Sequence, residues 1–243
     1  MISLQALSNP NSVDTIRITA VIDTALCVGA GGASGVLADK PIVRNSEGNL
    51  LIPASQFKGR LRHECEKIAR ALGWAISESP SAEKMVIRRA NAPIKFRRSE
   101  YELPGYNETY HCLISQIFGD PVLPSRVIVE DLIYTENPDN LPEVLRPGVT
   151  INRRRRIAEE KKLYFLETSP VNAQLKFEGS ILIQPSLKPE QPDYAPALIW
   201  AGLQHIHALG GSKSAGLGWL HWELPKIEVD DKVWQFLGKG GVK

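Results

Sequence analysis

Residues 28–62 read VGAGGASGVLADKPIVRNSEGNLLIPASQFKGRLR. The stretch runs from a glycine-rich turn, past the acidic residue Asp39, into a helix whose first turns carry Lys58, Arg60 and Arg62. Glycines let a backbone approach a ligand closely, and the amino end of a helix favours anions. The pattern therefore predicts a binding site for a phosphate backbone, with the carboxylate of Asp39 next to it.

The composition is that of an ordinary globular protein, with 43% hydrophobic and 23% charged residues in a chain of 243. A formal net charge of +2 does not by itself indicate a polyanion partner, so such a partner can be inferred only from local clusters of basic residues. Cys27, Cys65 and Cys112 are odd in number and lack CxxC spacing, which favours a reducing compartment over a disulfide framework. With no signal-peptide pattern and no long apolar stretch, we expect a cytoplasmic protein without a membrane partner.

Local patterns predict an alternation of strands and helices. Strands are expected at 13–26, 50–52, 126–134 and 173–184 and around 219–222, helices at 55–73, 108–118 and 193–209, an irregular insertion at about 75–107 and a long hairpin at 147–170. Ile16, Ile18, Ala20 and Ile22 alternate along one face of the first strand, which predicts an apolar face. In the first helix, helical spacing predicts a buried stripe of Phe57, Leu61, Cys65, Ile68, Ala69 and Leu72. Ser55 is expected to cap this helix. This order predicts an α+β, ferredoxin-like sheet with inserted loops, in a single domain over residues 1–243.

Two glycine-rich loops fail the usual nucleotide-binding fingerprints. In the first loop, Ser34 stands where the dinucleotide motif needs its third glycine. In the second, GGSKSAGLG at 210–218, Leu217 stands where a Walker A loop needs lysine. The loops can still present backbone N–H groups to phosphates. The simpler alternative is that both are tight turns without a ligand.

The cationic helix start and the histidines also have plainer interpretations. Lys58 and Arg62 share a helix face where the dipole favours anions, but charge runs are usually solvated surface. His205 and His207 lie two apart in an expected helix and so point away from each other. A zinc site can be drawn from His63, Cys65, His111 and Cys112, but spacings of this kind do not converge on one ion.

Four motifs taken in order resemble the RAMP superfamily of CRISPR-associated proteins. They are IPASQFKGRLR (52–62), IFGD (117–120), the GVTINRR and LYFLETSP halves of a hairpin (148–170), and LGGSKSAGLGWL (209–220). The combined order is more specific than either glycine loop, and the resemblance extends from about residue 14 to about residue 222. Within the superfamily, the sequence is most similar to the backbone subunit of type III, Csm-like, RNA-targeting effector complexes.

The resemblance implies a modified RRM-like, ferredoxin-type fold whose thumb-like hairpin enters between guide and target RNA. It implies CRISPR guide RNA, target RNA, other effector subunits and copies of the same chain in a filament as partners, in a prokaryotic cytoplasm. Two features depart from the family pattern. The NRRRR tip of the hairpin is unusually basic, and the cluster Arg88–Arg98 has no counterpart, which argues against a strict homo-filament.

The family's acidic residue before a Pro-Val-Arg-like segment is implicated in metal-dependent cleavage of target RNA, and LADKPIVR places Asp39 at that position. The resemblance thus implies Asp39 as the catalytic residue and as a ligand of Mg²⁺ or Mn²⁺, whose other ligands would be RNA and water, without an organic cofactor. It also maps 148–163 onto the thumb. RNA contacts are expected from Gly31, Gly32, Lys40, Arg44, Ser55, Lys58, Gly59, Arg60, Arg62, Arg153, Arg154, Arg155, Arg156, Gly210, Gly211, Ser212, Lys213, Ser214 and Gly216.

Two alternatives stay open at this level. A lone loop aspartate is more often a turn former than a catalyst, so Asp39 can equally belong to a non-catalytic, structural RAMP subunit. A guide-processing endoribonuclease that uses His63, His111 or His221 is the other alternative, although no pairing singles out one of these histidines. Because RNA carries its own nucleophile in the 2′-hydroxyl, cleavage by Asp39 would require mainly in-line geometry and assistance with deprotonation.

Overall fold

The computed structural model describes residues 13–29, 38–39, 41–78, 86–88, 109–121, 123–137, 141–142, 144–171, 173–186 and 193–238. Most of the predicted insertion at 75–107, including nearly all of Arg88–Arg98, falls outside these ranges. The crest of the first glycine loop also falls outside them.

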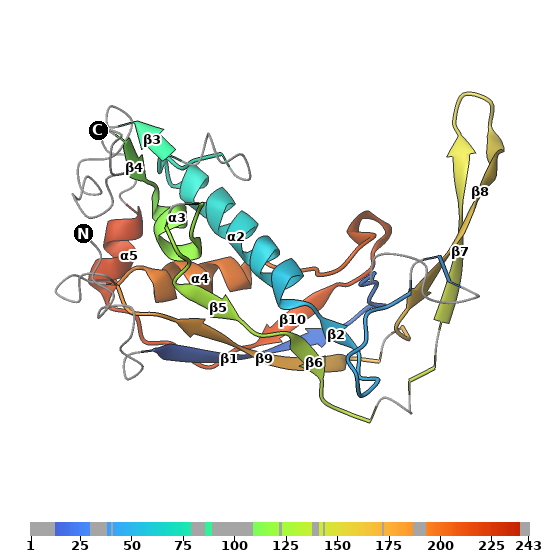
Figure 1. The fold of residues 1–243 in the computed structure, drawn as a ribbon, viewed down its shortest axis with the longest axis horizontal. Helices are drawn as coiled ribbons and strands as arrows, with labels where there is room; N and C mark the ends of the chain where they lie inside the picture. Colours follow the sequence, from blue (N-terminus) through green and yellow to red (C-terminus); the bar gives the residue numbers. More distant parts are fainter. Residues whose placement is uncertain are drawn as a thin grey trace.

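A six-stranded antiparallel sheet forms one layer of the molecule, in the order β10-β1-β9-β6-β2, with β5 also pairing with β9 (Figure 1). The two central strands pair along their whole length, from Asp14 opposite Ile183 to Ile22 opposite Leu175. The strands of this sheet are β1 (Asp14–Ile22), β2 (Leu51–Ile52), β5 (Val127–Val129), β6 (Leu132–Tyr134), β9 (Leu175–Ile183) and β10 (Leu220–Glu223).

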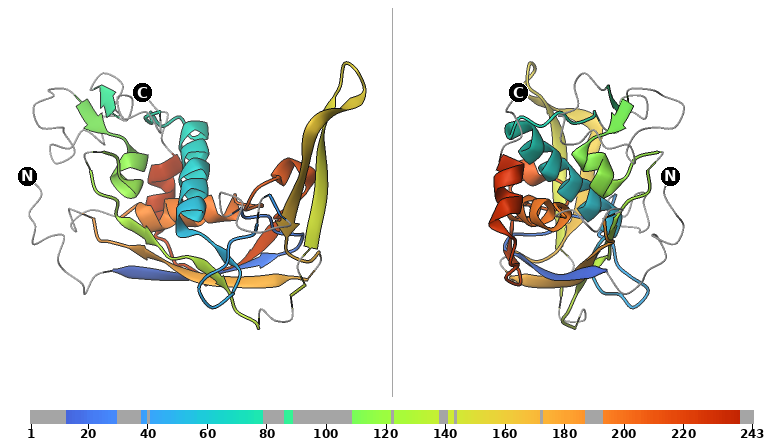
Figure 2. Two further views of the ribbon diagram at one scale, coloured as in Figure 1. Left: turned by 45° about the vertical axis from the view of Figure 1, so that its right-hand side comes forward. Right: turned by 90° about the vertical axis from the view of Figure 1, so that its left-hand side faces the viewer.

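The helices cover one face of this sheet (Figures 1 and 2). They are α2 (Ala54–Ala71), α3 (Leu113–Phe118), α4 (Ala195–Gln204) and α5 (Asp231–Gly238). Helix α2 packs closely on α4, because a Cβ atom at Gly202 would lie 2.5 Å from the Cys65 sulfur. The alternation predicted for β1 and the helical stripe predicted for α2 are confirmed. Their inward residues Ile16, Ile18, Ala20, Ile22, Phe57, Leu61, Cys65 and Ala69 are all buried.

A long hairpin, which we call the thumb, stands out from this body (Figure 1). It consists of β7 (Val144–Asn152) and β8 (Ile157–Thr168), which pair with each other and form a sheet of their own. The hairpin predicted at 147–170 is therefore confirmed at 144–168. A second small sheet pairs β3 (Val86–Arg88) with β4 (Thr109–His111).

The antiparallel sheet with helices on one face is the modified ferredoxin-like α+β arrangement that the sequence predicted. Among the helices that the structure describes, none is both long enough and apolar enough to cross a membrane.

Ser55 does not cap α2, so that prediction is wrong. The helix begins at Ala54, directly after Pro53, and Ser55 is an exposed residue of its first turn. Asp131, in the connection between β5 and β6, instead accepts a hydrogen bond of 2.6 Å from the Ala54 N–H. A carboxylate from another part of the chain thus supplies the cap that the sequence assigned to a local hydroxyl.

The helix predicted at 193–209 ends at Gln204, so His205 and His207 do not lie within it. Residues 207–209 pair instead with residues that precede and begin β10: the Leu209 N–H donates to Gly218, and the Leu220 N–H donates to His207. Similarly, residues 109–111 of the helix predicted at 108–118 form β4, and the strand predicted at 126–134 is divided into β5 and β6. At residues 109–111 and 207–209, pairing with another extended segment overrode the local helical pattern.

Candidate nucleic-acid interface

Four segments meet where the thumb joins the body, and we call this place the thumb junction. It consists of residues 24–29, residues 38–44 (Lys40 excepted), residues 165–169 and residues 209–218. The end of the thumb is held by a reciprocal pair of hydrogen bonds: Leu26 N–H donates to Ser169 Oγ at 2.8 Å, and Ser169 N–H donates to the Leu26 carbonyl at 2.9 Å.

Asp39 lies at the thumb junction and is bound to β8 at two points. Its N–H donates to the Phe165 carbonyl at 3.1 Å, and its Oδ2 accepts the Phe165 N–H at 2.7 Å. Pro147, opposite Phe165 in the hairpin, has no N–H and so cannot donate to the Phe165 carbonyl that accepts the Asp39 N–H. The carboxylate of Asp39 is exposed, and Oδ1 accepts no hydrogen bond from any residue that the structure describes.

Glu167, two residues further along β8, is a buried carboxylate with a partner for each oxygen. Oε2 accepts the Ile42 N–H at 3.0 Å, and Oε1 pairs with the Arg44 guanidinium at 3.1 Å. Arg44 also donates to the Gly48 carbonyl at 3.3 Å. The segment that carries Asp39 is therefore attached to the thumb at Phe165 and again at Glu167. Arg44, predicted to contact RNA, is occupied in this attachment.

The second glycine loop packs its base against the chain that follows β1. The Gly218 N–H donates to the Ala25 carbonyl at 2.8 Å, and the Gly211 N–H donates to the Cys27 carbonyl at 2.6 Å. The approach is so close that a Cβ atom at Gly210 would lie 2.6 Å from the Cys27 carbonyl oxygen. Within the base of the loop, a Cβ atom at Gly218 would lie 1.8 Å from the Leu209 carbonyl oxygen. The crest of the loop, residues 211–216, is exposed, and within it Lys213 donates to the Gly210 carbonyl.

The cations at the start of α2 are used inside the protein. Lys58 donates to Ser125 Oγ at 2.9 Å and to the Val127 carbonyl at 2.7 Å. Burial lowers the pKa of Lys58, and the neighbouring charge of Arg62 lowers it further. Arg62 donates to the Gly119 carbonyl at 2.9 Å and to Glu66 at 3.2 Å. Both side chains thus tie α2 to the chain between the end of α3 and the first residue of β5.

Arg60, the third cation of this turn, pairs with the buried carboxylate of Glu64 at 2.7 Å. Burial alone would raise the pKa of Glu64, but the hydrogen bond from Lys67 and the charges of Arg60 and Lys67 bring the pKa below its usual value. Gly59 is exposed, and a Cβ atom there would meet no atom within 4 Å.

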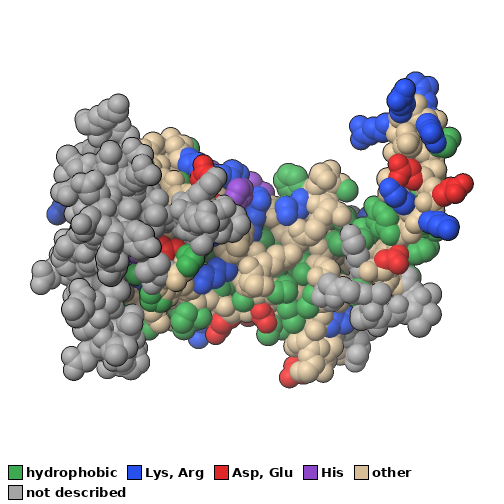
Figure 3. All heavy atoms as spheres, turned by 45° about the horizontal axis from the view of Figure 1, so that its top comes forward, with side chains coloured by type: hydrophobic (Ala, Val, Ile, Leu, Met, Phe, Trp, Pro, Cys, Tyr) green, Lys and Arg blue, Asp and Glu red, His purple; other side chains and the backbone are tan. Residues whose placement is uncertain are grey.

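The four consecutive arginines form the turn at the tip of the thumb. Asn152 shapes this turn, because its Oδ1 accepts the N–H groups of Arg154 and Arg155 and its carbonyl accepts the Arg156 N–H at 2.7 Å. Arg156 takes a positive φ of 56°, which closes the turn. All four arginines are exposed, and Figure 3 shows cations gathered at this tip.

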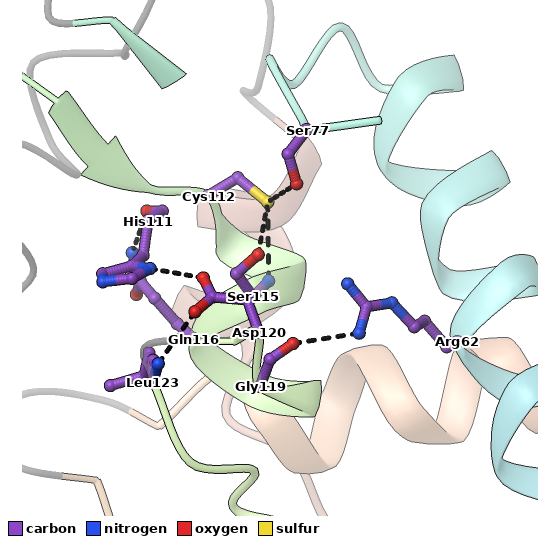
Figure 4. A network of polar contacts seen from close by, with 9 residues as sticks. All are labelled: Arg62, Ser77, His111, Cys112, Ser115, Gln116, Gly119, Asp120 and Leu123. Atoms are coloured by element: carbon purple, nitrogen blue, oxygen red, sulfur yellow. Dashed lines mark hydrogen bonds and ion pairs between the residues drawn. The ribbon is translucent and has the colours of Figure 1, made fainter. Parts of the chain in front are cut away.

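Gly119 and Asp120, the last two residues of the IFGD motif, belong to a network of polar contacts at the end of α3 (Figure 4). The Asp120 carboxylate contacts His111 Nδ1 at 2.5 Å and accepts the Leu123 N–H at 2.8 Å. Gly119 has a φ of +80°, and a Cβ atom there would lie 2.7 Å from the Ser125 nitrogen. Cys112 caps α3 by accepting the Ser115 N–H at 3.4 Å. In the sequence, the IFGD motif was identified only through the resemblance to the family, and no structural role was predicted for it.

The described residues contain no group of three or more His, Cys, Asp or Glu side chains that could hold a metal ion. The zinc site drawn from His63, Cys65, His111 and Cys112 is therefore not assembled. Cys65 is buried between α2 and α4, and burial raises the pKa of its thiol. His221 is exposed and pairs with Asp23 at 3.0 Å.

The structure thus brings together some of the predicted site residues and separates others. Asp39, Arg44 and residues 210–216 gather at the thumb junction, whereas the arginines of the tip lie at the far end of the thumb (Figure 1). Figure 3 shows the surface falling away between the helical body and the thumb. Gly31, Gly32 and Lys40 lie outside the described residues.

Sequence reasoning missed Glu167 and Ser169, which attach the thumb to the body. The available signal was the LYFLETSP run, in which a single acid follows four apolar residues. An acid in such a run indicates a buried, partnered carboxylate. Its partners, however, lie more than 120 residues earlier in the chain, so no local pattern names them.

Comparison with known proteins identifies the family of the chain. No curated protein matches the chain at a significant level. The sequence model of the RAMP superfamily matches residues 19–221, a span that includes α2, the thumb and the second glycine loop. Since this match extends over well more than half of the sequence, the chain belongs to the RAMP superfamily.

Proposed function

We propose that the chain is a CRISPR RNA-binding backbone subunit of a type III interference complex, and that it cleaves target RNA at its own position with Asp39. RAMP proteins generally bind CRISPR RNA and other effector subunits, and the superfamily includes some nucleases. The single observation that carries the catalytic part is the place of Asp39: an exposed carboxylate bound to the base of the thumb, with Oδ1 turned to no partner among the described residues.

The chemistry needs one carboxylate and a fixed geometry. When the thumb displaces a nucleotide, the neighbouring 2′-hydroxyl can align with the adjacent phosphate. Asp39 Oδ1 then accepts the hydroxyl proton while the 2′-oxygen–phosphorus bond forms and the bond to the 5′-oxygen breaks, and water returns a proton to the leaving 5′-oxygen. General base assistance of this kind contributes about 10²- to 10⁴-fold to a rate.

A divalent ion that takes part in cleavage would be held mainly by RNA and water. At the thumb junction the described residues offer one carboxylate oxygen of Asp39, since Glu167 is occupied by Ile42 and Arg44. This donor set does not make a protein metal site, because Mg²⁺ takes about six oxygen ligands. In the proposed reaction the Asp39 carboxylate is the base, and any divalent ion would be held by RNA phosphates and water.

The test is cleavage of a labelled target RNA by the assembled complex in which this subunit carries Asp39→Ala. We expect the product that ends at this subunit's position to disappear, while assembly and target binding are retained. Glu160→Gln, which changes an exposed carboxylate elsewhere on β8, is the matched control and should cut normally. Undiminished cleavage by Asp39→Ala would refute the catalytic assignment.

One observation favours a structural RAMP subunit as the second candidate function. Asp39 Oδ2 already accepts the Phe165 N–H, so the side chain has a structural use whether or not it acts on RNA. In that case the chain would hold guide RNA and its neighbouring subunits without cutting. Guide binding with no product at this position, in wild type and variant alike, would identify that function.

The arginines of the thumb tip are expected to set much of the salt dependence of RNA binding. Replacing Arg153–Arg156 by serine should lower the slope of log affinity against log salt by up to about 3, at about 0.7 for each single-strand phosphate contact. Unfolding should not change, because all four side chains are exposed. Measuring guide-RNA affinity across a salt series tests this, and an unchanged slope would contradict it.

Lys58→Met is the comparison variant in the same salt series. It removes a cation that already donates to Ser125 and Val127, so we expect the free energy of unfolding to fall by about 1–3 kcal/mol without a change in salt slope. A flatter slope for Lys58→Met would instead support the prediction that this side chain contacts the guide.

A further inference from the structure

Phe165 and Glu167 of β8, and Ser169 just after its last residue Thr168, each bind a segment outside the thumb. Phe165 uses its backbone to bind Asp39, Glu167 uses its side chain to bind Ile42 and Arg44, and Ser169 uses both to bind Leu26. Residues two apart on a strand point the same way, so these contacts form one continuous seam along the outer edge of β8. The segment that carries Asp39 lies along this seam.

Glu167 is the most constrained member of the seam. Its side chain is only 10% exposed, and both oxygens are occupied, one by a backbone N–H and one by a guanidinium. A carboxylate is buried at a large desolvation cost unless its partners are well placed. Loss of the carboxylate would leave the Ile42 N–H without its acceptor and would remove the ion pair between Glu167 and Arg44. Glu167 therefore holds the chain in place three residues beyond Asp39.

We infer that Glu167 is a positioning residue for Asp39, and that it makes the thumb and the Asp39 segment move as one unit. The inference rests on the proposed function, because it gives Glu167 a role in target cleavage. A nucleotide displaced by the thumb then arrives at a fixed place relative to the carboxylate. Glu167 itself touches neither RNA nor the reacting atoms.

The inference is tested in the assembled complex with Glu167→Ala and Glu167→Gln. Glu167→Ala removes both contacts, and we expect single-turnover cleavage to slow by about tenfold or more, since a shift of about 1 Å in a reacting group costs up to 10²-fold. Affinity for target RNA should not change. Glu167→Gln retains an oxygen that can accept the Ile42 N–H, so its cleavage should fall between those of wild type and Glu167→Ala.

A second measurement reads the position of the segment without any cleavage. In the full chain, amide hydrogen exchange of Asp39 and Ile42 should speed up in Glu167→Ala, while exchange in the paired strands β1 and β9 stays slow. The slow exchange of β1 and β9 shows that the variant is folded. Glu160→Gln, an exposed acid on the same strand, is the control and should leave both readings at their wild-type values.

The double variant Asp39→Ala with Glu167→Ala separates positioning from an independent role. If Glu167 acts through Asp39, the double variant cuts no more slowly than Asp39→Ala alone. A further loss in the double variant, or unchanged amide exchange in Glu167→Ala, would overturn the inference. If Asp39→Ala itself cuts at the wild-type rate, the proposed function fails as well. If Asp39→Ala is inactive and Glu167→Ala cuts normally, only the inference fails.

Discussion

Asp39→Asn is expected to slow cleavage at this subunit's position by at least about 100-fold while leaving the loop in place. The amide oxygen of asparagine can still accept the Phe165 N–H that Oδ2 accepts now, and the backbone hydrogen bond from residue 39 to the Phe165 carbonyl is unaffected. What asparagine lacks is a basic oxygen to take the proton of the 2′-hydroxyl. The variant therefore removes the chemistry and keeps the structure.

The comparison of Asp39→Asn with Asp39→Ala decides between the two candidate functions. If the carboxylate is catalytic, both variants lose the product, and Asp39→Asn retains wild-type amide protection at Phe165. If Asp39 serves only to fix the loop, Asp39→Asn behaves like wild type and only Asp39→Ala loosens the segment. Single-turnover cleavage and amide exchange on the same preparations give both readings, and normal cleavage by Asp39→Asn would exclude general base catalysis.

The case of Asp39 shows what the sequence could and could not predict. Its loop position and its neighbours Pro41 and Ile42 gave no reason to prefer catalysis over a turn, and only the resemblance raised it as a candidate. The contact with Phe165 spans 126 positions of the chain. No periodicity reports a contact of that separation, so the attachment of this segment to the thumb became visible only in the fold.

Helix α2 shows the same division between local and tertiary information. Helical spacing predicted the buried face of Phe57, Leu61 and Cys65 correctly, because an amphipathic stripe is written in the sequence itself. The same spacing gave no sign that Glu64 is buried. It also assigned Lys58 and Arg62 to a solvent-facing grip, whereas in the structure Lys58 donates to Val127 at the start of β5 and Arg62 donates to Gly119 just after α3. Side chains long enough to reach another element cannot be placed by periodicity alone.

Gly218→Ala is expected to be among the most destabilising single substitutions at the thumb junction. Gly218 has a φ of +72°, and the added Cβ atom would lie 1.8 Å from the Leu209 carbonyl oxygen. Moving this carbonyl away would break the backbone hydrogen bond between residues 209 and 218. Strain at positive φ and forced backbone shifts together should lower the free energy of unfolding by about 3 kcal/mol or more. Urea denaturation of the full chain measures this loss directly.

Gly216→Ala is the matched control, because Gly216 lies in the same loop and has a similar φ of +81°, but a Cβ atom there would meet nothing within 4 Å. It should cost only the left-handed backbone strain, about 1–2 kcal/mol. The difference between the two variants isolates the close approach of the loop to residue 209. Equal losses would mean that the crest of the loop is as constrained as its base, where Gly218 lies against Leu209.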